Sequence, residues 1–237
     1  RAWNIEGDRS RRGHFGPFNA VLLLAAVFGV GLFMRAEAKA ASPLIRLTMF
    51  RDPVLSASLA MSALVATVVT TTLVVGPFYL SRTLGLNAAL IGLVLSVGPL
   101  CAALTGVPAG RLADRLGPQR MTVLGLIGIA AGAFLLSVIP ATLGIYGYTA
   151  PLIVITVGYA LFQTANNTAV MTDTRPEQRG VISGLLNLSR NLGLITGASV
   201  MGAVFAAASS TIDITTAPPA AVAIGMQVTF AVAAVLI

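Results

Sequence analysis

Residues 110–120 read GRLADRLGPQR, a short polar stretch that separates two long apolar runs. Gly117 and Pro118 favour a tight turn, because glycine tolerates unusual backbone angles and proline suits the first turn of a helix. Asp114 is the one acid among three arginines, so it can pair with an arginine or accept hydrogen bonds from an open helix N-terminus. The stretch predicts a tight polar connection between two helices.

The apolar runs are long enough to cross a membrane. A spanning helix needs about 20 apolar residues, and seven candidate runs are 17–34, 53–80, 87–108, 118–139, 150–171, 181–207 and 219–237. Charged residues make up 10% of the chain and hydrophobic residues 56%, whereas a soluble domain is about 25% charged. Asp52-Pro53 and Asn87 supply helix caps or a first-turn proline. The sequence therefore predicts an all-α membrane protein.

Positive charges are distributed unevenly between the runs. Nine lie in the loops expected on one side, namely 35–52, 109–120 and 172–180. Only Arg82 lies in the loops expected on the other side, namely 81–86, 140–149 and 208–218. The positive-inside rule places the first set in the cytoplasm of a protein integral to the cell (plasma or inner) membrane. This topology explains the net charge of +7, so we expect no nucleic-acid partner. Residues 1–16, with four arginines, are expected outside against the rule.

The connection at 110–120 resembles the signature loop of the major facilitator superfamily, G-x-L-a-D-R-x-G-r-k. Six positions match that pattern: Gly110, Leu112, Ala113, Asp114, Arg115 and Gly117. Pro118 and Gln119 replace the usual basic pair, which leaves Arg120 as the late positive charge. The resemblance implies a conformational signature loop formed by Gly110, Asp114, Arg115, Gly117 and Arg120. The alternative is a plain positive-inside loop with a turn.

Two further stretches resemble the 14-helix drug:proton antiporters of that superfamily, the EmrB/QacA type. Residues 43–53, PLIRLTMFRDP, resemble the linker into their second half, and residues 179–197, RGVISGLLNLSRNLGLITG, resemble their penultimate helix. The resemblance implies an extra transmembrane helix and cytoplasmic linker in 1–52, then a six-helix C-terminal half in 53–237 made of two inverted three-helix repeats. It also implies proton-driven efflux of drugs or other small lipophilic compounds.

The chain has no initiator methionine and stops within an apolar run, so we expect a fragment cut at both ends. On that view its partners are the lipid bilayer, a small-molecule substrate and the missing N-terminal half of the same transporter.

Three helix faces are candidates for function. Small residues recur every four positions in a ladder made of Gly98, Ala102, Gly106 and Gly110. Such a stripe lets another helix approach closely. By resemblance that helix belongs to the missing half, so the ladder should lie exposed on this chain. Two polar faces, on the fifth and sixth of the seven runs, predict a substrate pathway lined by Tyr159, Gln163, Asn166, Asn167, Asn187, Arg190 and Asn191.

Arg190 is the one ionisable residue that we place within a span. A buried arginine costs at least about 2.5–3.5 kcal/mol at mid-membrane, so it needs a partner or a water-filled cavity. We expect it to point toward the fifth of the seven runs, 150–171, with Asn166 or Gln163 as its partner. The alternatives are that Arg190 reaches the cytoplasmic interface and that the amides only join helices. No Asp or Glu lies within a span, so the carboxylate usual for proton coupling is not supplied.

Other classes of protein have little support. His14 is the only histidine and Cys101 the only cysteine, so we expect no metal, no cofactor and no enzyme activity. A seven-helix receptor or another non-transport membrane protein is the alternative. A retinal protein needs a lysine in its last helix, but the only lysine is Lys39, in a loop.

Overall fold

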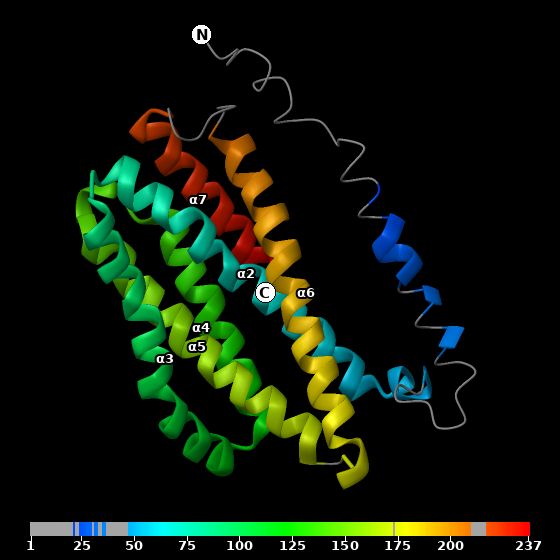
Figure 1. The fold of residues 1–237 in the computed structure, drawn as a ribbon. Coiled ribbons are helices and arrows are strands. Elements are labelled where there is room, and N and C mark those ends of the chain that lie inside the picture. Colours follow the sequence, from blue (N-terminus) through cyan, green and yellow to red (C-terminus); the bar gives the residue numbers. More distant parts are fainter. Residues whose placement is uncertain are drawn as a thin grey trace. The chain divides into compact units, whose positions relative to one another are not determined.

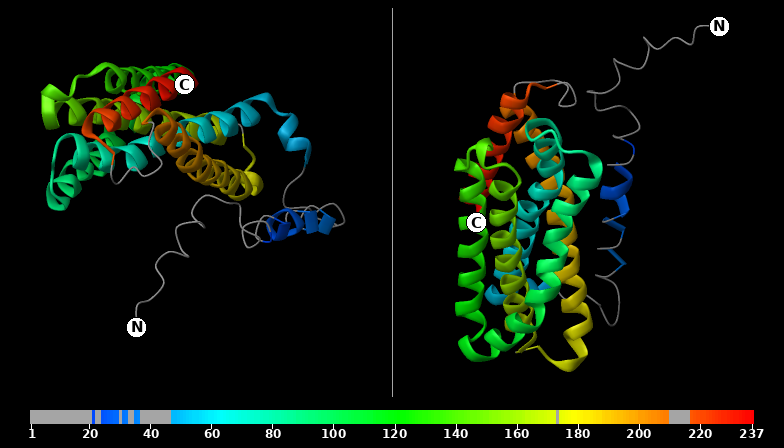
Figure 2. Two further views of the ribbon diagram at one scale, coloured as in Figure 1. Left: turned by 90° about the horizontal axis from the view of Figure 1, so that it is seen from above. Right: turned by 90° about the vertical axis from the view of Figure 1, so that its left-hand side faces the viewer.

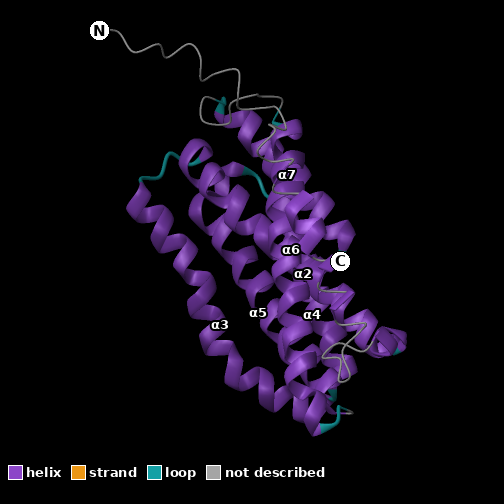
Figure 3. Cartoon of the chain, turned by 45° about the vertical axis from the view of Figure 1, so that its right-hand side comes forward, coloured by secondary structure: helices purple, strands orange, loops and turns teal. Residues whose placement is uncertain are grey.

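The computed structural model describes residues 21, 24–29, 31–32, 35–36, 47–172, 174–209 and 217–237, and the long elements among them are all helices (Figures 1 and 3). Among these described residues, six helices are long and apolar enough to cross a membrane, as the sequence predicts for 53–237. Their bounds are α2 Pro53–Phe78, α3 Ala88–Leu116, α4 Pro118–Val138, α5 Gly144–Thr172, α6 Arg179–Ala208 and α7 Pro219–Leu236. A π-helix, η3 (Tyr79–Thr83), extends α2.

The chain separates into two compact units, 1–49 and 50–237. The expected first span, 17–34, falls in the first unit and lies largely outside the described residues, although those described within it are helical. The fold below is that of the second unit, residues 50–237. There the structure describes both expected triplets.

The helix starts follow the local chemistry of the sequence. The Asp52 carboxylate accepts a hydrogen bond from the Val54 N–H at 2.9 Å, with Pro53 at the first helical position. The Asn87 side chain accepts from the Leu90 N–H at 2.9 Å in the same way. These caps satisfy N–H groups that the first turn of a helix leaves free. The predicted starts at 53, 87 and 118 are therefore confirmed to within a residue.

Two predicted boundaries are wrong. The third run was expected to end at 108, but α3 continues to Leu116, so most of the expected loop 109–120 is helical. Pro108 is tolerated because a proline inside a membrane helix costs little where neighbouring groups satisfy the freed carbonyl. The turn consists of Gly117 alone, with φ +79°, a conformation that only glycine adopts without strain. The fifth run begins at Gly144, six residues before the expected start at 150.

Two helix pairs are joined by backbone contact at glycines. A methyl group on Gly158 of α5 would lie 2.8 Å from both the Gly125 carbonyl oxygen and the Ile129 nitrogen of α4. A methyl group on Gly197 of α6 would lie 2.6 Å from Cα of Thr67 in α2. In that second pair the Thr67 hydroxyl also donates to the Gly193 carbonyl at 3.0 Å. Close approach at small residues is how membrane helices gain packing energy without a hydrophobic effect between them.

Some of the remaining contacts are those expected of two inverted repeats. α2 of the first triplet packs on α6 of the second, and α3 of the first packs on α5 of the second, which is the equivalent pair when the triplets are exchanged. α4 packs on α7, which is also consistent with the exchange, whereas the extensive α4–α5 contact has only a small counterpart between α2 and α7. Figure 2 shows the six helices side by side with their axes roughly aligned. In the most apolar stretches only 11% of α3 and 22% of α6 are buried, against 50% of α2, so α3 and α6 leave the broadest faces uncovered.

The α4–α5 contact makes a specific prediction. Gly158→Ala should lower the free energy of unfolding by about 1–3 kcal/mol, because its methyl group meets backbone atoms that cannot move aside. The matched control is Gly180→Ala, because Gly180 at the start of α6 has open space where the methyl group would lie, and the change should be neutral or stabilising. Thermal unfolding of the purified protein in detergent measures both. Equal stability of the two variants would contradict the packing.

The alternating helices also predict which ends face the cytoplasm. In a Cys101→Ala background, a single cysteine at Arg115 should resist an impermeant thiol reagent added to intact cells, whereas one at Ser81 should react. Both positions are exposed in the structure, so accessibility differs only through the side of the membrane. If the reagent labelled a cysteine at residue 115 from outside the cell, the predicted orientation would be wrong.

Candidate functional site

Helix α6 carries a cluster of candidate residues. Asn187 and Asn191 are exposed, and Arg190 is partly buried. Ser189, Gly193 and Gly197 of the same helix pack on α2. The Arg190 Nη2 donates to the Asn187 side-chain oxygen at 3.3 Å, and its Nε is buried without a partner among the described residues. The structure therefore brings these three predicted pathway residues together on one face.

A contact with α2 fixes the depth of this cluster. The Ser189 hydroxyl donates to the Leu59 carbonyl, so Arg190 lies level with residues near Leu59. Leu59 is six residues beyond Pro53, which is about 9 Å of helix. Because Arg51 and Asp52 directly precede α2, we infer that the edge of the apolar layer lies near this helix start. On that inference Arg190 lies inside the layer.

The predicted partner of Arg190 is wrong. Asn166 is 2% exposed and its amide nitrogen donates to the Ser62 hydroxyl at 2.9 Å and to the Ser58 carbonyl at 3.4 Å. It therefore joins α5 to α2. No hydrogen bond links Arg190 to Asn166 or Gln163 in the described part of the chain. The physical reason is that α5 and α6 each pack on α2 and contact one another little, so similar depth does not bring their side chains together.

The other predicted residues of α5 have mixed environments. Tyr159 and Gln163 are half-buried, and Asn167 is exposed. None of the three has a side-chain hydrogen bond to α6 within the described residues. The seven predicted pathway residues thus do not form one lining, because Asn166 serves helix contact while the α6 cluster faces outward.

The sequence reasoning missed two buried serines of α2. The Ser62 hydroxyl and the Ser58 backbone carbonyl accept hydrogen bonds from the Asn166 amide. Their spacing of four residues places them on one face of a helix, and this signal was present in the sequence. Serine in an apolar run is weak evidence alone, since its hydroxyl can bond to its own helix.

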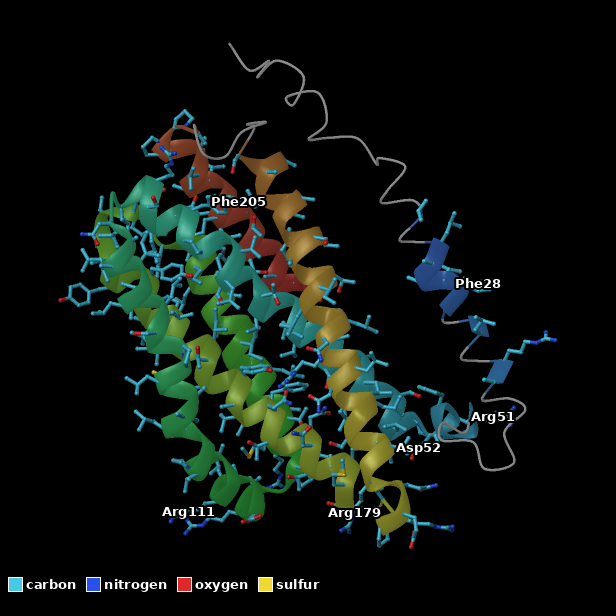
Figure 4. The ribbon with its side chains drawn as sticks, in the orientation of Figure 1. Phe28, Arg51, Asp52, Arg111, Arg179 and Phe205 are labelled. Atoms are coloured by element: carbon cyan, nitrogen blue, oxygen red, sulfur yellow. The ribbon has the colours of Figure 1, made fainter. Side chains whose placement is uncertain are left out.

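The signature residues lie at one end of the unit. Asp114, Arg115 and Arg120 are exposed around the Gly117 turn, and Gly110 is half-buried on α3. The Asp114 carboxylate has no ion pair or side-chain hydrogen bond to any described residue, so the pairing that the sequence suggested is not formed here. Figure 4 shows Arg111 and Arg179 at this same end, away from Phe205. Among the described residues no group of His, Cys, Asp and Glu could hold a metal ion.

The ladder of small residues does not share one environment. Gly98 is buried, and a methyl group there would lie 3.7 Å from the Thr156 hydroxyl of α5. Ala102 is half-buried, whereas Gly106 and Gly110 have open space beside them. The expectation of one exposed stripe is therefore wrong at Gly98, because α5 already occupies that end of the face. The end nearer the Gly117 turn remains uncovered.

Asn166 provides a test of helix joining. Asn166→Ala should cost about 0.6–1.7 kcal/mol of stability, the range measured for interhelical hydrogen bonds in membrane proteins. Its exposed neighbour is the matched control, and Asn167→Ala should change little. Unfolding in mixed detergent micelles measures both. A cycle with Ser62→Ala should show that the two losses are not additive, and additive losses would exclude the Asn166–Ser62 bond.

Comparisons with known proteins agree on one family. The family model described as Major Facilitator Superfamily matches residues 14–198. The uncharacterized transporter YebQ of Escherichia coli is 32% identical over 182 residues, which cover 77% of this chain and 40% of that protein. The drug efflux pump JefA of Mycobacterium tuberculosis is 31% identical over 206 residues, covering 86% and 40%. The multidrug efflux pump LfrA of Mycolicibacterium smegmatis is 25% identical over 197 residues, covering 77% and 37%.

The residues matched by the family model include the connection at 110–120, helices α2 to α5 and most of α6. The chain spans about two-fifths of the length of the curated relatives. It is a multi-pass integral membrane protein. On the combined evidence of helices, signature turn and family match, the chain belongs to the major facilitator superfamily.

Proposed function

We propose that this chain is the C-terminal portion of a secondary transporter of the 14-helix type, which exports drugs or other small lipophilic compounds in exchange for protons across the cell membrane. Support comes from family membership and from relatives whose names describe drug efflux. The resemblance of residues 43–53 and 179–197 to drug:proton antiporters adds the helix number and the coupling ion. In this proposal residues 1–52 form the extra helix and linker, and residues 53–237 the six-helix half.

One observation carries the proposal: a charged, amide-bearing face of α6 lies inside the apolar layer and is uncovered. Asn187 and Asn191 are exposed beside Arg190. Polar groups at this depth are costly against lipid and usually border a water-filled cavity or substrate path. Hence α6 lines the pathway, and the surrounding lipophilic surface suits a lipophilic substrate.

The second wall of the pathway belongs to the N-terminal half of the transporter. Major faces of α3 and α6 are uncovered in the unit, and Figure 1 shows these helices at opposite edges of it. A partner half that packs on both edges would enclose the face between them. Spans α2 to α7 contain no Asp or Glu away from their ends, so the proton-binding acid is assigned to that partner half.

The signature turn is proposed to stabilise one conformation of the transporter. Asp114 is exposed at the cytoplasmic end with no partner among the described residues, so its charge is free to meet a helix N-terminus or an arginine of the partner half. A receptor would not need this turn, and no observation here favours one. The family match and the efflux pumps among the relatives likewise favour a transporter over an enzyme.

Efflux tests this function directly. The full-length transporter that contains this chain, expressed in cells without their own pumps, should lower the accumulation of a lipophilic dye such as ethidium. Asp114→Asn should reduce export by about tenfold at normal membrane insertion, because it removes the charge and keeps the shape. Glu177→Gln is the matched control, since Glu177 is an exposed acid in the other cytoplasmic connection. If the Asp114→Asn variant exported as much dye as wild type, the turn would have no role beyond connecting α3 to α4.

A further inference from the structure

Arg190 is a charged residue deep in the helix bundle, and the described residues offer it no negatively charged partner. It lies eleven residues into α6, about 16 Å from the helix start, and level with α2 about 9 Å past Pro53. Both estimates place it within the apolar layer. Its buried Nε shows that this part of the side chain lies against the bundle, while Nη2 contacts Asn187, one turn nearer the start of α6.

The hydrogen-bonding capacity of Arg190 is mostly unused. A guanidinium has five N–H donors, and the described residues offer it one amide oxygen at 3.3 Å. The helices packed on α6 carry no Asp, Glu, Lys or Arg at this depth. Charged groups that the structure describes lie at the ends of these helices, for example Asp52 before α2, Glu177 before α6 and Arg179 at the start of α6. An unpaired cation inside the apolar layer is unfavourable, so a negatively charged group bound beside Arg190 would stabilise this site.

We propose that the Arg190 guanidinium binds a carboxylate in the transport pathway. The planar fork of arginine matches the two oxygens of a carboxylate, and Asn187 and Asn191 add neutral donors beside it. The carboxylate has two possible sources, an anionic substrate or an acidic side chain of the transporter outside these 237 residues. The site rests on the proposed function for its role in transport, but carboxylate binding itself does not require transport.

The sign of a stability change identifies a carboxylate from the protein. We measure thermal unfolding of the purified full-length transporter at pH 8 and pH 5.5. If an acidic side chain pairs with Arg190, Arg190→Gln leaves that carboxylate buried and unpaired. The variant should then be less stable than wild type at pH 8. The difference should narrow at pH 5.5, because the acid has lost its cation, its pKa rises, and protonation removes the charge.

Ligand binding identifies a carboxylate from the substrate. The probes are 1-pyrenebutyrate and its neutral methyl ester, with affinity followed by pyrene fluorescence. In this case wild type should bind the carboxylate about tenfold or more tightly than Arg190→Gln does, while the ester binds both within about twofold. Without ligand, Arg190→Gln should be at least as stable as wild type at both pH values.

Two variants complete the design. Arg190→Lys keeps the charge but loses the planar fork, so it should lie between wild type and Arg190→Gln in either measurement. Arg179→Gln is the matched control, since Arg179 is an exposed arginine of the same helix, and it should behave as wild type.

The proposal is overturned if Arg190→Gln is at least as stable as wild type at both pH values and also binds 1-pyrenebutyrate as tightly as wild type does. Absence of dye export by wild type would instead contradict the proposed function. Because unfolding and probe binding need no transport, the two failures are distinguishable.

Discussion

Backbone contact between helices at glycine is the constraint on which the rest of this structure depends. Gly158 lies against the backbone of α4, and Gly197 against the backbone of α2. In a membrane the hydrophobic effect does not drive helices together, so packing has to come from close van der Waals contact. Glycine permits the closest approach, and each of these two contacts fixes a helix pair.

The two tight pairs determine which surfaces are left for function. α2 packs on α6 and also contacts α5 and α7, so half of its most apolar stretch is buried. α3 and α6 retain wide uncovered faces. The polar cluster around Arg190 lies on one of these helices. The arrangement therefore separates helices that hold the unit together from helices that can border a pathway.

The same arrangement gives two polar side chains at similar depth different roles. Asn166 is buried against the hydroxyl of Ser62, and its hydrogen bond joins α5 to α2. Among the described residues Arg190 has a single neutral amide as partner, and its buried Nε has none. An amide can be satisfied within a helix bundle, whereas a guanidinium needs a negative charge as well as hydrogen bonds. This difference makes Arg190 the stronger candidate for ligand or partner binding.

The sequence alone determined the membrane class, the six helices of 53–237, their caps and the resemblance of the 110–120 turn. These follow from composition, run length and residues such as Asp52 and Asn87, whose effects are local. Only the tertiary structure decided that α3 continues to Leu116, that Gly98 is covered by α5, and that Asn166 meets α2 rather than Arg190. Helical periodicity predicts which side chains share a face, but which neighbour that face meets depends on the close contacts between distant helices.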